Sequence, residues 1–225
     1  MSTRETVSVI IPAFNAQEFV AEAIESALAQ THPPAEIVVV DDGSTDGTAD
    51  AIRRFGTRVE MVQRTNGGIG AARNSAVERC AGTHIALLDA DDIWEPRKLT
   101  LQLAAMAEGG ADLAFCLAVN FRHLDGGNLD TGGVLRGHGP SAMLVTRAAF
   151  DRVGLFDETL RVGEFLDWLA RAREARLKEV EVDEVLLRRR WHETNTGIVQ
   201  SANRVDYTRA LRAALQRRRA LDPDA

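Results

Sequence analysis

In Leu87-Leu88-Asp89-Ala90-Asp91-Asp92 an apolar run ends in three carboxylates within four positions. The run begins at His84, and short continuous apolar runs are typical of strands that are buried on both faces of a parallel sheet. The sequence therefore predicts a buried strand that brings acidic side chains to one edge of a sheet.

The three carboxylates also predict a metal site, because such closely spaced charges repel one another unless a cation lies among them. On an extended strand Asp89 and Asp91 point the same way about 7 Å apart. They can share one small ion if the chain bends after the strand or if a water molecule completes the coordination shell of the ion. Oxygen ligands favour Mg²⁺ or Mn²⁺. We expect Asp91 to bind the metal, and Asp92 to cap a helix that Pro96 opens.

Composition and charge limit the function classes. The 225 residues are 45% hydrophobic and 27% charged, which is typical of a soluble globular protein with a real core. The net charge of -6 argues against a nucleic-acid-binding protein, which would normally carry a basic face. Cys80 and Cys116 lie in apolar or helical patterns, so we expect reduced core residues of a cytoplasmic protein.

The sequence predicts no membrane-spanning segment, because no apolar run reaches about 18 residues. The apolar region near the N-terminus is also too short for a signal peptide. Two basic clusters, Arg188-Arg189-Arg190 and Arg217-Arg218-Arg219, could make peripheral contact with a lipid surface. For the second cluster we favour a solvated helix or strand face over lipid contact.

The first hundred residues alternate strand and helix four times, which indicates a parallel α/β sheet with right-handed crossovers. Pro12 is expected to stop the first strand. Ligands of such sheets bind beyond the carboxyl ends of the strands. Here three of those ends, at 13–15, 41–42 and 89–91, carry polar side chains. The expected strands are 7–11, 36–40, 59–62 and 84–88, and the expected helices are 19–28, 48–55, 71–80 and 97–108.

The second half of the chain has a different pattern. Residues 120–140 are rich in Gly, Asn and Asp, which predicts a loop or a ragged hairpin. We expect further strands at 113–119, 142–146, 180–182 and 185–187, and helices at 163–174 and from 203 onward. With no repeats and no linker, we expect one domain over 1–202 and a tail over 203–225. Apolar residues of the tail could pair two chains: Val205, Leu211, Leu215 and Leu221.

Four motifs in register resemble those of the family 2 inverting glycosyltransferases with the GT-A fold. They are Ile11-Pro12-Ala13-Phe14-Asn15, Val40-Asp41-Asp42-Gly43-Ser44-Thr45-Asp46, Gly67-Gly68-Ile69-Gly70-Ala71-Ala72-Arg73-Asn74 and Leu88-Asp89-Ala90-Asp91-Asp92. The match covers roughly residues 5–195. The resemblance implies a Rossmann-like, mostly parallel central sheet flanked by helices, with a small antiparallel portion on the acceptor side. It implies a nucleotide-binding part at about 5–95 and an acceptor part at about 110–195.

The resemblance also implies an activity. The donor would be a nucleoside-diphosphate sugar, Mn²⁺ or Mg²⁺ would bridge its diphosphate, and a single displacement would invert the anomeric carbon. Phe14 would lie against the base, where the family more often has Tyr, and Asp41 would accept a hydrogen bond from the base. This pair favours uridine. The alternative for Asp41 is a turn acid at the end of a strand. The acceptor is not predicted, although residues 120–140 are expected to shape its site.

The donor contacts implied by the resemblance include Arg73, which would reach base, ribose or phosphate. The preceding glycines would permit close backbone approach, and the alternative for Arg73 is a cation on a helix surface. Asp89 would contact ribose or the metal, and Asp91 would bind the metal. The full set of donor-binding residues is Pro12, Ala13, Phe14, Asn15, Asp41, Gly68, Arg73, Asp89, Ala90 and Arg190.

A late element, Arg190-Trp191-His192, resembles the family's Arg-x-His, which touches metal or diphosphate. The alternative for His192 is a structural role. The general base departs from the family's adjacent Glu-Asp, because Phe165 stands where the Asp belongs. Glu164 and Asp167 share a helical face, about 5–6 Å apart at Cβ, and either could deprotonate the acceptor. We rank Glu164 first, since Gly163 places it at the site edge. The alternative is that both carboxylates only favour the helix dipole.

Two other functions stay open at this point. A non-catalytic sugar-nucleotide-binding module would account for the altered Glu-Asp motif. A sugar nucleotidyltransferase has a related fold but usually begins with a Gly-rich loop bearing Arg or Lys after the first strand. Residues 12–15 lack such a loop, which argues against the nucleotidyltransferase.

Overall fold

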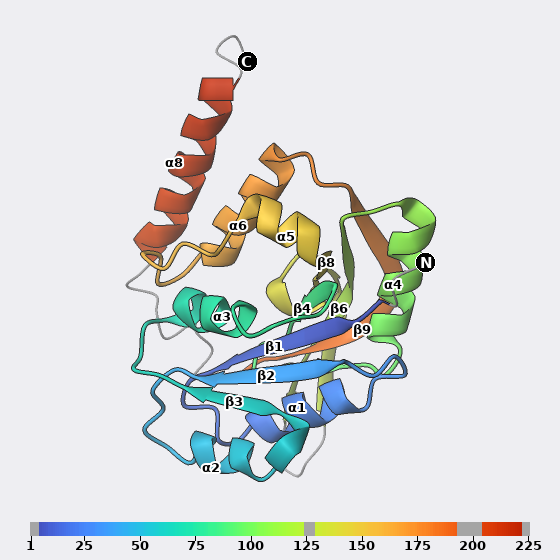
Figure 1. Cartoon of the computed structure of the whole chain (residues 1–225), viewed down its shortest axis with the longest axis vertical. Coiled ribbons are helices and arrows are strands. Elements are labelled where there is room, and N and C mark those ends of the chain that lie inside the picture. Colours follow the sequence, from blue (N-terminus) through green and yellow to red (C-terminus); the bar gives the residue numbers. More distant parts are fainter. Residues whose placement is uncertain (1–4, 124–128, 193–203, 222–225) are drawn as a thin grey trace.

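A computed structural model describes residues 5–123, 129–192 and 204–221. These residues form a nine-stranded sheet flanked by helices (Figure 1). The strands are β1 (Val7–Ala13), β2 (Glu36–Asp41), β3 (Glu60–Gln63), β4 (His84–Leu87), β5 (Ile93–Trp94), β6 (Leu113–His123), β7 (Leu129–Gly137), β8 (Leu144–Thr146) and β9 (Glu179–Arg190). The helices are α1 (Val20–Leu28), α2 (Thr48–Arg53), α3 (Ile69–Val77), α4 (Lys98–Gly109), α5 (Arg147–Val153), α6 (Glu164–Glu174) and α8 (Arg204–Leu221), with 3-10 turns η1 (Gly56–Arg58) and η2 (Pro140–Ala142).

The strand order is β3-β2-β1-β4-β8-β6-β9-β5, and β7 pairs with β6. The first four strands in this order are parallel, as predicted. Helices α1 and α2 lie on one side of them and α3 on the other (Figure 1). This arrangement follows from right-handed crossovers, since the chain moves outward from β1 to β3 and then returns past β1 to β4.

The first strand runs two residues further than predicted, through Pro12 to Ala13. Alternate residues of a strand face the same neighbour, and Ile10 faces β4 because its carbonyl accepts the N–H of Leu88 (3.0 Å). Pro12 therefore also faces β4, but the pairing with β4 ends at Ile10. No ladder hydrogen bond is lost at Pro12, so the strand can continue.

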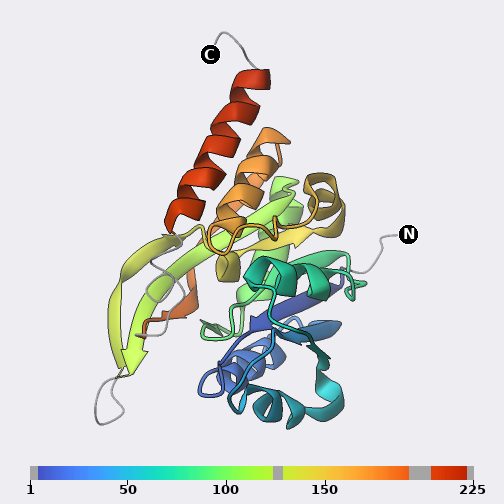
Figure 2. The same cartoon turned by 90° about the vertical axis from the view of Figure 1, so that its left-hand side faces the viewer.

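The second half of the sheet is mixed. Strand β8 is antiparallel to both β4 and β6, whereas β9 is parallel to β6. The loop or hairpin predicted for 120–140 is a hairpin of β6 and β7 that extends away from the parallel strands (Figure 2). The two strands predicted at 180–182 and 185–187 are one strand. Polar Asp183 and Glu184 interrupt its apolar pattern at a register shift against β6.

Two elements were not predicted, β5 and α5. The helix expected over 97–108 begins at Lys98 with Arg97 as its N-cap residue, so Pro96 precedes this helix and does not open it. Both cysteines are buried with free thiols, as expected for core residues. Burial raises the pKa of Cys80 to about 12.

Among the helices that the structure describes, none combines the length and the apolar character needed to cross a bilayer.

Candidate active site

The acidic turn follows β4 directly, and we use this name for residues Asp89–Asp92. The N–H of Asp92 donates to the carbonyl of Asp89 (3.1 Å), so the chain bends just after the strand. This bend is the condition that a shared ion would require. The side chains of Asp89 and Asp91 are 28% and 27% exposed. Their carboxylates are therefore partly open to solvent at the carboxyl edge of the sheet.

Asp92 does not cap a helix, so that prediction was wrong. Its buried carboxylate accepts the backbone N–H of Arg190 (3.1 Å) and the hydroxyl of Ser141. Burial, together with the charges of Asp91 and Asp89, raises the pKa of Asp92 well above its ordinary value. Asp92 thus joins the acidic turn to β9.

Asp91 and His192 contact each other across 101 positions of sequence. The imidazole Nε2 lies 3.0 Å from Asp91 Oδ2, and the His192 side chain is 19% exposed. The ring of His192 also packs against Phe19, with 4.5 Å between centroids. A carboxylate and an imidazole are a suitable donor pair for Mn²⁺ or Mg²⁺, whose other ligands are commonly phosphate and water. Across the described ranges no group of three His, Cys, Asp or Glu side chains could hold an ion without such outside ligands.

Arg190 is buried beside this pair. Its Nε donates to the backbone carbonyl of Asp91 (3.1 Å), and its Nη2 forms an ion pair with Glu22. The guanidinium also lies over the rings of Phe19 (5.1 Å) and Phe121 (4.6 Å). These contacts hold the backbone that carries Asp91 and His192, while contact of Arg190 with a donor stays a prediction.

Arg73 lies behind Asp89 and is not a surface cation. Its side chain is 1% exposed, and it pairs with Asp89 (Nη2 to Oδ1, 2.7 Å) and with Glu164. Burial lowers the pKa of Arg73, but the charges of Asp89 and Glu164 outweigh it and leave the pKa raised. Nε of Arg73 has no hydrogen-bond partner among the described residues. Arg73 therefore connects α3 to the acidic turn and to the start of α6.

The two candidates for the general base face different surroundings. Glu164 is buried against Arg73 and beside Gly70, where a Cβ atom would lie 3.6 Å from Glu164 Cγ. Asp167 instead accepts from Arg171 (2.8 Å) on its own helix and from Arg217 (3.1 Å) of α8. Of the two candidates, Glu164 is the one that pairs with Arg73, which also pairs with Asp89.

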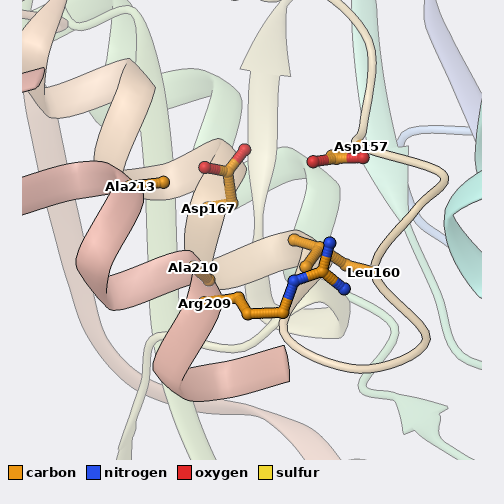
Figure 3. A pocket seen from close by; sticks show the side chains of 6 residues that line it. All are labelled: Asp157, Leu160, Asp167, Arg209, Ala210 and Ala213. Carbon is orange, nitrogen blue, oxygen red and sulfur yellow. The ribbon is translucent and has the colours of Figure 1, made fainter. Parts of the chain in front are cut away.

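A cavity of about 140 Å³ lies on the Asp167 side of α6 (Figure 3). Its lining comes from α6, from α8 and from the segment between α5 and α6: Asp157, Leu160, Asp167, Arg209, Ala210 and Ala213. Asp167 lines this cavity and pairs with Arg171 and Arg217. These contacts suit a residue that attaches α8 to α6 better than they suit a general base.

The predicted nucleoside end lies at the ends of β1 and β2. Phe14 is 51% exposed, so its ring is available for stacking. Asn15 has a positive φ of 48° and its Oδ1 accepts the N–H of Thr45 (2.9 Å). Asp41 is buried and accepts the N–H of Ser44 (3.0 Å). Asp41 thus does serve the turn, and its predicted contact with a base stays a prediction.

Asp42 has a role in this region that was not predicted from the sequence. Its carboxylate accepts the N–H groups of Gly67 (3.0 Å) and Gly68 (2.8 Å) and pairs with Arg64 (3.2 Å). Gly43, with φ +77°, allows this approach, because a Cβ there would lie 2.7 Å from the backbone N of Asn66. Two features of the sequence could have indicated this contact, namely the adjacent acids Asp41 and Asp42 at the end of β2 and the later pair Gly67-Gly68.

Ser141 is a second missed residue. Its hydroxyl is 1% exposed, accepts the N–H of Asp89 (3.0 Å) and donates to Asp92. Its carbonyl accepts the indole N–H of Trp94 (2.7 Å). One hydroxyl from η2 therefore contacts both ends of the acidic turn, and no local motif marks it in the sequence.

Comparisons with known proteins identify the family. The model of glycosyl transferase family 2 matches residues 8–128. The chain is 41% identical over 113 residues to the putative teichuronic acid biosynthesis glycosyltransferase TuaG of Bacillus subtilis, which covers 48% of this chain and 45% of that protein. It is 31% identical over 209 residues to an uncharacterized glycosyltransferase of Rickettsia felis, covering 83% of this chain and 34% of that protein. The chain thus spans less than half the length of these two relatives.

Solved structures support the fold. TarS of S. aureus (residues 1–349, in complex with UDP) superposes with a TM-score of 0.70 at 22% identity, over 84% of this chain and 61% of that one. The mannosyltransferase PcManGT of Pyrobaculum calidifontis, in complex with GDP-Man and Mn²⁺, gives a TM-score of 0.68 at 19% identity, over 94% and 65%. The GT-A fold and the family match over more than half of the sequence together identify the chain as a member of glycosyl transferase family 2.

Proposed function

We propose that this glycosyltransferase moves a sugar from a UDP-sugar to an acceptor hydroxyl, with inversion at the anomeric carbon and with the help of Mn²⁺ or Mg²⁺. In this proposal residues 5–95 hold the donor and residues 110–195 help to hold the acceptor. The observation that carries it is the pairing of Asp91 with His192 (3.0 Å) beside Asp89, which Arg73 holds in place.

The nucleoside would bind at the ends of β1 and β2. The exposed ring of Phe14 offers a stacking surface, and the Asp41 carboxylate can accept more than the two hydrogen bonds from Ser44 and Gln63. We favour uridine because TarS has been solved in complex with UDP and with UDP-GlcNAc. The complex of PcManGT with GDP-Man makes guanosine the alternative to be tested.

Asp91 and His192 would hold the divalent cation, which when bound supplies positive charge against the leaving diphosphate. The chain's own contribution is positional. Arg190 holds the backbone of Asp91, and Asp92 holds the end of β9, so the two ligands are fixed before a donor arrives.

Glu164 would act as the base. The acceptor proton would pass to its carboxylate, the acceptor oxygen would bond to the anomeric carbon, and the bond to the diphosphate would break with its electron pair. The Arg73 guanidinium forms an ion pair with this carboxylate and holds it in position.

A binding module without turnover is the second candidate. Two observations favour it, namely that Phe165 replaces the family's Asp and that Glu164 is engaged by Arg73. The experiment below distinguishes the two functions, because a binding module retains donor without releasing UDP.

Release of UDP tests the proposal. The chain is incubated with UDP-glucose, UDP-GlcNAc or GDP-mannose, with Mn²⁺ or with EDTA. The released UDP, or GDP in the case of GDP-mannose, is quantified, and donor binding is measured in parallel by calorimetry. We expect Mn²⁺-dependent binding and slow UDP release by the wild type, and neither by Asp91→Ala. Asp50→Ala is the matched control, because Asp50 is exposed and pairs with Arg53 of its own helix α2. Metal-dependent donor binding by Asp91→Ala would contradict the metal assignment, and binding without any UDP release would support the module.

A further inference from the structure

The C-terminal helix α8 carries charge opposite to that of the rest of the chain. Residues 204–221 contain six arginines and one aspartate, a formal charge of +5. The whole chain carries -6, so all other residues together carry -11. Such a concentration of one sign on one helix produces a strongly directional field.

One face of α8 is fixed to the body of the protein. Ala210 is buried, and Asp206 accepts the backbone N–H of Arg161 (3.0 Å). Arg217 forms ion pairs with Asp167 (3.1 Å) and Glu174 (2.8 Å) of α6. These contacts determine which side of α8 faces outward.

The outward side is both apolar and basic. Leu211 and Leu215 lie one helical turn apart and are 60% and 54% exposed, and Val205 on the first turn is 62% exposed. The exposed residue Arg212 lies on the same side, next to the leucines. Helix α8 lies beside α6 and extends beyond it at its C-terminal end (Figures 1 and 2), so this side is accessible to a broad surface.

We propose that α8 docks the enzyme on an anionic lipid surface. In this arrangement Leu211 and Leu215 enter the boundary between headgroups and acyl chains, while the exposed Arg212 contacts lipid phosphates. A helix that is apolar and basic on its free side, at an edge of an otherwise acidic protein, has the chemistry of such an interfacial helix. The acidic remainder is repelled by the same surface, so the charge distribution also orients the protein.

Charge argues against the other occupants of this face. Pairing of two α8 helices would bring the arginines of both copies together over a small apolar stripe, which is unfavourable. A bound nucleic acid would place its phosphates against Leu211 and Leu215, and it would be repelled by the negative charge of the rest of the protein. An anionic bilayer offers an apolar region for the two leucines and phosphates for the basic side of the helix.

Vesicle flotation tests the proposal. The chain is mixed at low salt with vesicles of phosphatidylcholine alone or with 40% phosphatidylglycerol. We expect flotation only with the anionic vesicles and its loss at high salt. Leu211→Ser/Leu215→Ser and Arg212→Glu should each weaken binding at least about tenfold. The matched controls are Leu155→Ser and Arg54→Glu, which make the same two kinds of substitution at exposed residues outside α8. Both should bind as the wild type does.

Three results would overturn the proposal. One is no flotation with anionic vesicles, and another is equal flotation of the wild type and both α8 variants. The third is a dimer in light scattering that Leu211→Ser/Leu215→Ser abolishes without lipid, because the face would then belong to a second copy. Unchanged thermal unfolding of the variants establishes that loss of binding is not loss of the fold.

Discussion

Arg73 and Glu164 form an ion pair between α3 and α6 in which both side chains are almost fully buried, at 1% and 7% exposure. Removing one partner of such a pair leaves the other charge buried alone, which typically costs about 3–5 kcal/mol. We therefore expect Arg73→Met to lower the free energy of unfolding by about 3 kcal/mol in urea denaturation. The double variant Arg73→Met/Glu164→Gln should recover part of this loss. No recovery would mean that Arg73 stabilises the fold through Asp89 and Phe156 instead.

Glu164→Gln and Asp167→Asn should differ in their effect on turnover. Glu164→Gln removes the proposed base while keeping its size, so turnover should fall at least about 100-fold with donor affinity unchanged. Asp167→Asn weakens the contacts with Arg171 and Arg217 and should lower the unfolding temperature while turnover continues. Steady-state kinetics and calorimetry check both. Full activity of Glu164→Gln, or a selective loss of turnover in Asp167→Asn, would reverse the assignment.

Ser141→Ala should weaken the proposed metal binding without removing a proposed metal ligand. The hydroxyl of Ser141 contacts both Asp89 and Asp92, and groups that support ligands in this way typically contribute about 10–100-fold to metal affinity or activity. We expect the Mn²⁺ concentration for half-maximal UDP release to rise about tenfold, with a smaller change at saturating metal. Ser75→Ala is the control, because it also removes a hydrogen-bonded serine hydroxyl, in this case one that accepts from Arg64. An unchanged metal requirement in Ser141→Ala would show that the turn holds its shape without this residue.

Lys98 should give the stability a measurable pH dependence in the alkaline range. Its amino group is fully buried between Gln102 (2.8 Å) and the Trp94 ring (4.0 Å), and burial lowers its pKa from 10.5 to about 8. The unfolded chain then binds more protons between pH 8 and 10.5, so the destabilisation is complete below pH 8 and is relieved as pH rises. Relative to Lys98→Met, the wild type should gain up to about 3 kcal/mol over this window. A difference between the two proteins that does not change with pH would contradict a lowered pKa.

The sequence predicted the features that depend on neighbours along the chain. Parallel strands buried on both faces appear as continuous apolar runs, so β1, β2 and β4 could be located, and the acids at their ends followed. The two-residue strand β5 and the short helix α5 carry too few residues for a pattern.

Residues whose role depends on distant partners were the ones assigned wrongly or missed. Asp92 has the local features of a cap, but its partner is the backbone of Arg190, 98 positions away. Asp42 binds an amide 26 positions away, and Ser141 binds one 52 positions away. Glu164 and Asp167 share a helix turn, yet α3 and α8 gave them different surroundings. Only the tertiary structure reveals such pairings.

The short pairing of β5 with β9 also has a consequence for evolution. Ile93 pairs with Arg188 and Trp94 with Leu187. This register fixes the position of His192, which follows β9, relative to the acidic turn, which precedes β5. Inserting or deleting a single residue late in β9 would exchange inward and outward side chains and turn His192 away from Asp91. Length changes should therefore accumulate in the β6–β7 hairpin, while the spacing from β5 to His192 stays constant.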